Sequence, residues 1–145
     1  MFFLFLGVLG IGIRLNIAKE NLIWGALGGI LSMSVLNSLS SHIPYPATVF
    51  FTAFSGSVFS EILARIKKTP VTVFLPLSII PILPGKAVYD AIKLAIHEDT
   101  HLFLESSISV LYTTLSMALG IITVKTIEII FSGIKRPTRP ICRDF

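Results

Sequence analysis

The chain has 145 residues, of which 53% are apolar and only 14% are charged, and its mean hydropathy is +0.84. Soluble domains carry roughly a quarter charged residues, so this composition excludes a soluble domain and predicts an integral membrane protein. The net charge of +4 does not indicate nucleic-acid binding, because the basic residues cluster beside apolar segments. The single cysteine, Cys142, excludes a disulfide framework and a cysteine metal cluster.

The first apolar segment, residues 1–13, predicts a short helix that Arg14 closes. The segment has neither the basic start nor the small-residue cleavage site of a removable signal. It is short for a membrane span, so we expect either local thinning of the bilayer or a helix that begins upstream.

The next two spans are predicted at residues 22–39 and 45–64, since no Asp, Glu, Lys or Arg occurs from 21 to 60. Trp24 lies near the start of the first, where interfacial aromatic residues belong. Both spans carry small residues at helical spacing, which let other helices approach closely. These are Gly25, Gly28 and Gly29 in one span and Ala53, Gly56, Ser57 and Ser60 in the other.

The fourth predicted span, residues 71–83, is short and rich in proline. An interior proline removes a backbone donor and clashes with the preceding turn. We therefore expect a kinked or broken helix, whose freed backbone groups need neighbouring helices or water. The prolines are Pro76, Pro81 and Pro84, and Gly85 follows them.

An amphipathic helix is predicted at 86–97, lying at the membrane interface or against the bundle. Its apolar stripe comprises Val88, Ile92, Ala95 and Ile96, and its polar stripe comprises Lys86, Asp90, Lys93 and His97. The last span is predicted at 105–124, with the helix continuing past the membrane towards a basic tail at 135–145.

Basic residues are distributed unevenly between the two sides of this topology. One side collects ten of them, and the other collects only Lys86 and Lys93. Because cytoplasmic loops carry the excess of lysine and arginine, we expect the N-terminus outside and the tail in the cytoplasm.

The string His97-Glu98-Asp99-Thr100-His101 matches HExxH, in which two histidines bind zinc and the glutamate is a general base. It lies at a helix end in an acidic loop, with no third ligand at a recognisable spacing. A solvated polar loop is therefore the preferred interpretation, and neither a metal nor a cofactor is expected.

Two further features allow either a functional or a structural interpretation. The break at Pro81, Pro84 and Gly85 either forms a midplane substrate site, as discontinuous helices do in transporters, or is a packing kink. Glu61, at the end of the third span, is a functional candidate, but an interfacial ion pair with Arg65, four residues on, is the favoured interpretation.

The same residues resemble a known family, the threonine/serine exporters, over nearly the whole chain, from about Gly7 to Thr123. The resemblance is to the family's C-terminal five-helix half, which also occurs as a separate small protein. It rests on Gly56-x-x-x-Ser60-Glu61, Arg65, Pro70 and Ile80-Pro81-x-x-Pro84-Gly85-x-x-x-Tyr89-x-Ala91.

This resemblance implies a carrier that exports small hydrophilic amino acids, driven by an ion gradient. A five-helix protein of this kind is half a transporter and needs a complementary membrane half, for which the small-residue faces offer room. Our candidate residues for substrate binding or transport, taken from the helix break and the ionisable pair, are Pro81, Pro84, Gly85, Tyr89, Glu61 and Arg65.

The sequence thus predicts an all-α polytopic membrane protein with about five transmembrane helices in one domain, located in the plasma membrane. It is expected to be a transporter subunit for threonine-like or serine-like amino acids or related small carboxylates, and not an enzyme. The alternatives are a membrane scaffold that transports nothing and, less favoured, an HExxH metalloprotease.

Overall fold

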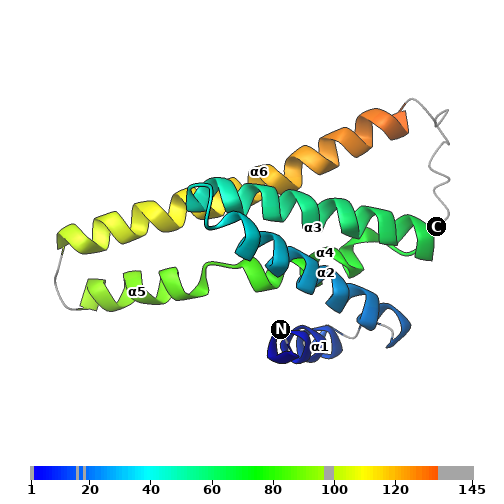
Figure 1. Ribbon diagram of the computed structural model, residues 1–145, viewed down its shortest axis with the longest axis horizontal. Coiled ribbons are helices and arrows are strands. Elements are labelled where there is room, and N and C mark those ends of the chain that lie inside the picture. Colours follow the sequence, from blue (N-terminus) through cyan, green and yellow to red (C-terminus); the bar gives the residue numbers. More distant parts are fainter. Residues whose placement is uncertain (1, 16, 18, 97–99, 134–145) are drawn as a thin grey trace, which may run out of the picture.

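The computed structural model describes residues 2–15, 17, 19–96 and 100–133, and these residues form helices with no strand among them (Figure 1). The all-α prediction is confirmed. The elements are α1 (Phe2–Arg14), α2 (Lys19–Leu39), α3 (Tyr45–Lys67), η1 (Val71–Val73), α4 (Leu75–Ile79), η2 (Ile80–Ile82), α5 (Gly85–Ile96) and α6 (Thr100–Gly133).

Prolines mark where the short elements begin. Pro76 and Pro81 occupy the first turns of α4 and η2, where the missing N–H costs no helical hydrogen bond. Leu83 has an extended backbone (φ −53°, ψ 132°), because the ring of Pro84 disfavours a helical conformation in the residue before it. The predicted proline-broken helix is therefore confirmed, as a 3₁₀–α–3₁₀ segment that ends at Leu83.

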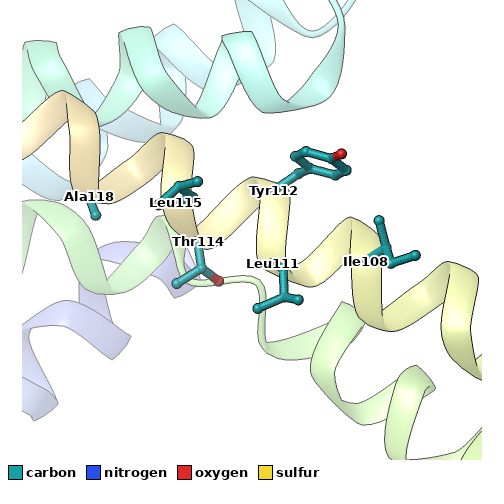
Figure 2. Close-up of a pocket in the computed structure, with 6 residues that line it drawn as sticks. All are labelled: Ile108, Leu111, Tyr112, Thr114, Leu115 and Ala118. Carbon is teal, nitrogen blue, oxygen red and sulfur yellow. The ribbon is translucent and has the colours of Figure 1, made fainter.

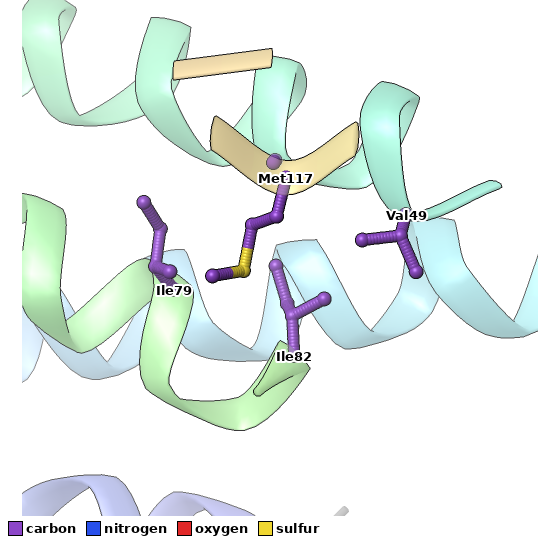
Figure 3. Packing of buried hydrophobic residues seen from close by; sticks show 5 residues of the cluster. Val49, Ile79, Ile82 and Met117 are labelled. Atoms are coloured by element: carbon purple, nitrogen blue, oxygen red, sulfur yellow. The ribbon is translucent and has the colours of Figure 1, made fainter. Parts of the chain in front are cut away.

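Helix α3 lies at the centre of the packing, in contact with α2, α4 and, most extensively, α6. The core between these elements contains Val49 and Ala53 of α3, Ile79 of α4, Ile82 of η2 and Met117 of α6 (Figure 3). Because Met117 reaches both sides of the α4–η2 junction, α6 holds the broken segment against α3.

The small face of α2 is covered by α4 of the same chain. A Cβ added at Gly25 would lie 2.2 Å from Leu77 Cδ1, and one added at Gly29 would lie 3.0 Å from the Leu77 carbonyl oxygen. These glycines therefore permit the close helix approach that the sequence predicted, and the helix that approaches them is α4. The expectation that this face has room for another protein's helices is wrong for these positions.

Helix α5 packs along the first part of α6 (Figure 1), which agrees with a position against the bundle. Its buried residue is Ala91, whereas Ile92 and Ile96 of the predicted apolar stripe are 56% and 74% exposed. In a membrane, apolar side chains such as these can face lipid while small residues face other helices.

Within the described part of the chain, three helices are long and apolar enough to cross a membrane: α2, α3 and α6. Helix α1 has 13 residues, and the chain from η1 to α5 is divided at Leu83. Helix α6 has 34 residues, which is 14 more than the 20 of the predicted span, and extends roughly 50 Å at 1.5 Å per residue. The structure is that of an all-α membrane protein, and five crossings stay a prediction.

Candidate functional site

The helix break places its backbone polar groups at a turn between η2 and α5. The Gly85 amide donates to the Leu83 carbonyl oxygen (2.7 Å), and the Val88 amide donates to the Pro84 carbonyl oxygen (3.0 Å). The first amides of a helix have no partner inside it. Those of Lys86 and Ala87 therefore remain as donors, a few residues after the end of η2 at Ile82.

The two sides of this break differ in their burial. Pro81 lies against α2, where its Cγ would be 3.4 Å from a Cβ placed on Gly29. A Cβ placed on Gly85 would meet nothing within 4 Å, and Tyr89 is 66% exposed. The backbone at the start of α5 is therefore accessible, with the Tyr89 side chain one turn further along.

Glu61 and Arg65 both find their partners on α6. Glu61, whose side chain is 9% exposed, accepts a hydrogen bond from Lys125. Arg65 Nη2 lies 3.7 Å from Glu128 Oε1, and Lys125 Nζ also lies 3.2 Å from Glu128 Oε2. The expected pair between Glu61 and Arg65 is thus wrong, because each side chain is directed at a partner on α6.

A cluster of buried hydroxyl groups lies where α2, α3 and α4 meet. Ser60 Oγ is hydrogen-bonded to Ser78 Oγ (3.1 Å), and both side chains are fully buried. Ser32 of α2 is also fully buried, and its Oγ would be 2.6 Å from a Cβ placed on Gly56. Gly56 therefore lets three helices bring their hydroxyl groups together.

Sequence reasoning identified Gly56 and Ser60 but missed Ser32 and Ser78. The available signal was the repeated four-residue spacing, Gly28 to Ser32 and Gly56 to Ser60, which puts each pair on one helix face. Because Ser60 and Glu61 are adjacent on α3, this polar region connects the broken segment on one side with the Lys125 ion pairs on the other.

The predicted site residues therefore fall into two groups with different neighbours. Pro81, Pro84, Gly85 and Tyr89 line the break, whereas Glu61 and Arg65 lie with Lys125 and Glu128 at the end of α3. Sequence reasoning assigned Lys125 and Glu128 no role in a site, because their positions, 64 and 63 residues beyond Glu61 and Arg65, carry no local signal.

A groove of about 600 Å³ runs along α6, and Figure 2 shows the side chains of its lining, among them Leu111, Thr114 and Leu115. All but two of these side chains are purely apolar, so the groove suits hydrocarbon better than a zwitterion. A second cavity, of about 300 Å³, lies between α5 and α6 and is polar. Its lining is Ala87, Asp90, Glu105, Ser106 and Ser109.

The HExxH string lies largely outside the described residues, since only its last two positions, Thr100 and His101, fall within them. His101 is exposed at the start of α6. Within the described part of the chain, no three His, Cys, Asp or Glu side chains come together as metal ligands.

Comparison with known proteins supplies the family. The family model described as Threonine/Serine exporter, ThrE matches residues 1–127. Neither a search among curated proteins nor one among solved structures finds a match. The matched range includes the helix break, the buried hydroxyl cluster and Lys125. The chain belongs to the threonine/serine exporter family.

Proposed function

We propose that this chain is one subunit of a plasma-membrane carrier that exports threonine-like or serine-like amino acids, with the substrate bound at the break before α5. Family membership indicates a membrane component of an exporter and a small amino-acid substrate. The proposed location of the substrate site depends on what surrounds Gly85. Its φ is not positive, and a Cβ there would meet nothing, so neither backbone conformation nor packing requires glycine.

The chemistry of a zwitterion fits the groups at this break. Its carboxylate needs donors, and the free amides and positive end of α5 supply them at Lys86 and Ala87. Its ammonium needs acceptors, for which the carbonyl groups ending η2 are available. Tyr89 adds a hydroxyl and an aromatic wall one turn into α5, and Gly85 lets the backbone approach the ligand.

The polar cavity between α5 and α6 extends this site. Asp90 follows Tyr89 directly, and the cavity adds Glu105 and the hydroxyl groups of Ser106 and Ser109. Carboxylates at this place attract an ammonium group and repel a bare anion. We therefore favour a zwitterionic amino acid over a simple carboxylate as the substrate.

The complementary half would complete the path, because this chain alone leaves α6 mostly uncovered. Only 22% of the apolar window of α6 is buried, against 56% in α3. The small-residue face of α2 is already occupied by α4. The apolar groove of α6 is therefore the better place for the partner's helices (Figure 2).

Gly85→Leu tests the proposal. The added side chain enters open space in the free chain, so insertion, expression and co-purification with the complementary half should persist, while export falls. The measurement is export of labelled threonine and serine from loaded cells that express both halves.

Gly10→Leu on α1 is the matched control, because a Cβ at Gly10 also meets nothing within 4 Å. If Gly85→Leu exports like the wild type, the break is only a packing kink. Assembly of the complex without flux of any amino acid would favour a scaffold. Metal-dependent peptide hydrolysis that His97→Ala and His101→Ala abolish would favour the enzyme.

A further inference from the structure

The end of α3 is a basic corner of the molecule. Arg65, Lys67 and Lys68 lie within four residues of one another, and all three are exposed. Arg65 lies near Glu128 of α6, whereas neither lysine forms an ion pair with another residue that the structure describes. The two ammonium groups at this corner therefore lack a carboxylate partner within the described part of the chain.

The backbone of Lys68 has an uncommon conformation. Helix α3 ends where Lys68 adopts the left-handed region (φ 52°, ψ 35°), and among the described residues it is the one non-glycine residue with a positive φ. Its amide and that of Thr69 both donate to the Ala64 carbonyl oxygen. Glycine is the usual residue at such a helix end, because a Cβ disfavours this conformation. A lysine here reduces the stability of the fold, which indicates that its side chain has a function.

Trp24 of α2 places this corner at the membrane interface. Lys67 Nζ lies 5.0 Å from the centroid of the Trp24 ring, and tryptophan is enriched at the level of the lipid headgroups. Leu27 and Leu31 follow Trp24 at helical spacing and share its face of α2, and all three side chains are exposed. An apolar stripe thus extends from the headgroup level into the membrane, with the Lys67 ammonium group at its interfacial end.

We propose that Lys67 and Lys68 bind the phosphate group of an anionic phospholipid, and that an acyl chain of the same lipid lies along Leu27 and Leu31. The charge and the apolar stripe together select this partner. A free phosphate would contact the lysines but not the stripe, and phosphatidylcholine would bring a positive choline group to the lysines. An anionic phospholipid supplies a net negative headgroup and hydrocarbon at once. The proposal depends neither on the substrate site nor on export.

A lipid at this corner would connect two helices. Lys67 contacts Trp24 near the start of α2, and Lys68 is the residue that ends α3. A ligand that binds only the folded protein raises its stability. Phosphatidylglycerol should therefore raise the thermal midpoint of the wild type more than phosphatidylcholine with the same acyl chains.

Trp24 is the single tryptophan of the chain, so its fluorescence reports directly on this corner. The full chain is reconstituted in phosphatidylcholine vesicles that contain brominated phosphatidylglycerol or brominated phosphatidylcholine, since bromine quenches tryptophan on contact. The wild type should be quenched at a lower mole fraction of brominated phosphatidylglycerol. Lys67→Gln and Lys68→Gly should each weaken this preference by up to about fivefold, the size expected for one lysine at an anionic lipid surface.

Lys68→Gly separates the lipid site from the fold. Glycine suits the left-handed conformation better than lysine, so the thermal midpoint without anionic lipid should not fall. The increase that phosphatidylglycerol causes should nevertheless become smaller. Arg14→Gln is the matched control, because it removes one exposed basic residue at the end of α1. It should keep the wild-type preference for phosphatidylglycerol.

Four results would overturn the proposal. Equal quenching of the wild type by both brominated lipids would show that the headgroup is not distinguished, and a wild-type preference in both lysine variants would show that the lysines do not bind it. An equal loss in Arg14→Gln would indicate general surface charge only. Relief of quenching by inorganic phosphate would show that the lysines bind free phosphate and not lipid. Because no flux is measured, failure of the proposed export function leaves this test unchanged.

Discussion

At the scale of single residues, glycine decides how closely the helices approach one another. A Cβ at Gly28 would lie 2.3 Å from Ser78 Oγ and 3.1 Å from a ring carbon of Phe59. A Cβ at Gly120 would lie 2.7 Å from the Phe50 carbonyl oxygen. Because the membrane offers no hydrophobic force between helices, such close backbone contact is a main source of their association.

Gly28→Val should therefore destabilise the protein. Forcing extra atoms into a packed interior costs roughly 1–3 kcal/mol, and here the neighbours are a buried hydroxyl and an aromatic ring. The measurement is the thermal unfolding midpoint in detergent, with Gly7→Val on α1 as the control, because that position is open. Equal midpoints for the two variants would show that α4 does not pack on Gly28.

Tyr89→Phe should reduce export without affecting stability. The side chain is 66% exposed, and substitutions at such positions usually change stability by less than about 0.5 kcal/mol. Loss of the hydroxyl would remove one contact to the substrate in the proposed site. Tyr112→Phe is the control, since Tyr112 is 63% exposed on α6. If both variants export equally well, the Tyr89 hydroxyl does not contact the substrate.

At the scale of elements, the segment from η1 to α5 is the feature that distinguishes this chain from a simple helix bundle. Its pieces are three to twelve residues long, too short to be stable helices in isolation. They are held by packing, with Leu77 and Ser78 on the glycines of α2 and Ile79 and Ile82 on Met117 of α6 (Figure 3). The break is thus a local effect of proline that tertiary contacts fix in place.

Pro84→Ala should weaken export by joining η2 to α5. Without the ring, Leu83 can return to a helical conformation, and the amides of Lys86 and Ala87 would then find carbonyl partners within the helix. Export of labelled threonine, corrected for expression, is the readout. Pro46→Ala is the control, because Pro46 lies in the first turn of α3, where proline does not interrupt the helix. Equal export by the two variants would contradict a role for the freed amides.

At the scale of the whole molecule, one end collects the basic residues that we expect in the cytoplasm. Lys67, at the end of α3, lies 5.0 Å from the ring of Trp24, near the start of α2, and Glu61 joins the ends of α3 and α6 through Lys125. The start of α2 and the ends of α3 and α6 are therefore on the same side (Figure 1). This arrangement agrees with the grouping of basic residues on which the predicted orientation depends.

Labelling of Cys142 tests the orientation. An impermeant thiol reagent should leave Cys142 unmodified in intact cells and modify it after permeabilisation, because the basic tail is predicted to be cytoplasmic. For comparison, Glu105→Cys in a Cys142→Ser background should react in intact cells, since the start of α6 is predicted to face outside. The reverse pattern would invert the topology.

The sequence by itself determined the class of protein, the helical segments and the position of the break. A stretch of forty uncharged residues allows only membrane-spanning helices, and proline acts on its own turn and on the residue before it. The predicted span at 45–64 and the observed α3 accordingly begin at the same residue. The residues that carry the family resemblance could also be recognised from the sequence, because they lie close together along the chain.

Only the tertiary structure decided which faces meet. Sequence patterns could not show that α4 covers the glycines of α2, or that Glu61 pairs with Lys125 and not with Arg65. The physical reason is that lipid and protein interior are equally apolar, so hydrophobicity does not distinguish a face covered by protein from a face covered by lipid. Contacts between residues 18 or 64 positions apart, such as Ser60 with Ser78 and Glu61 with Lys125, arise only when the helices pack.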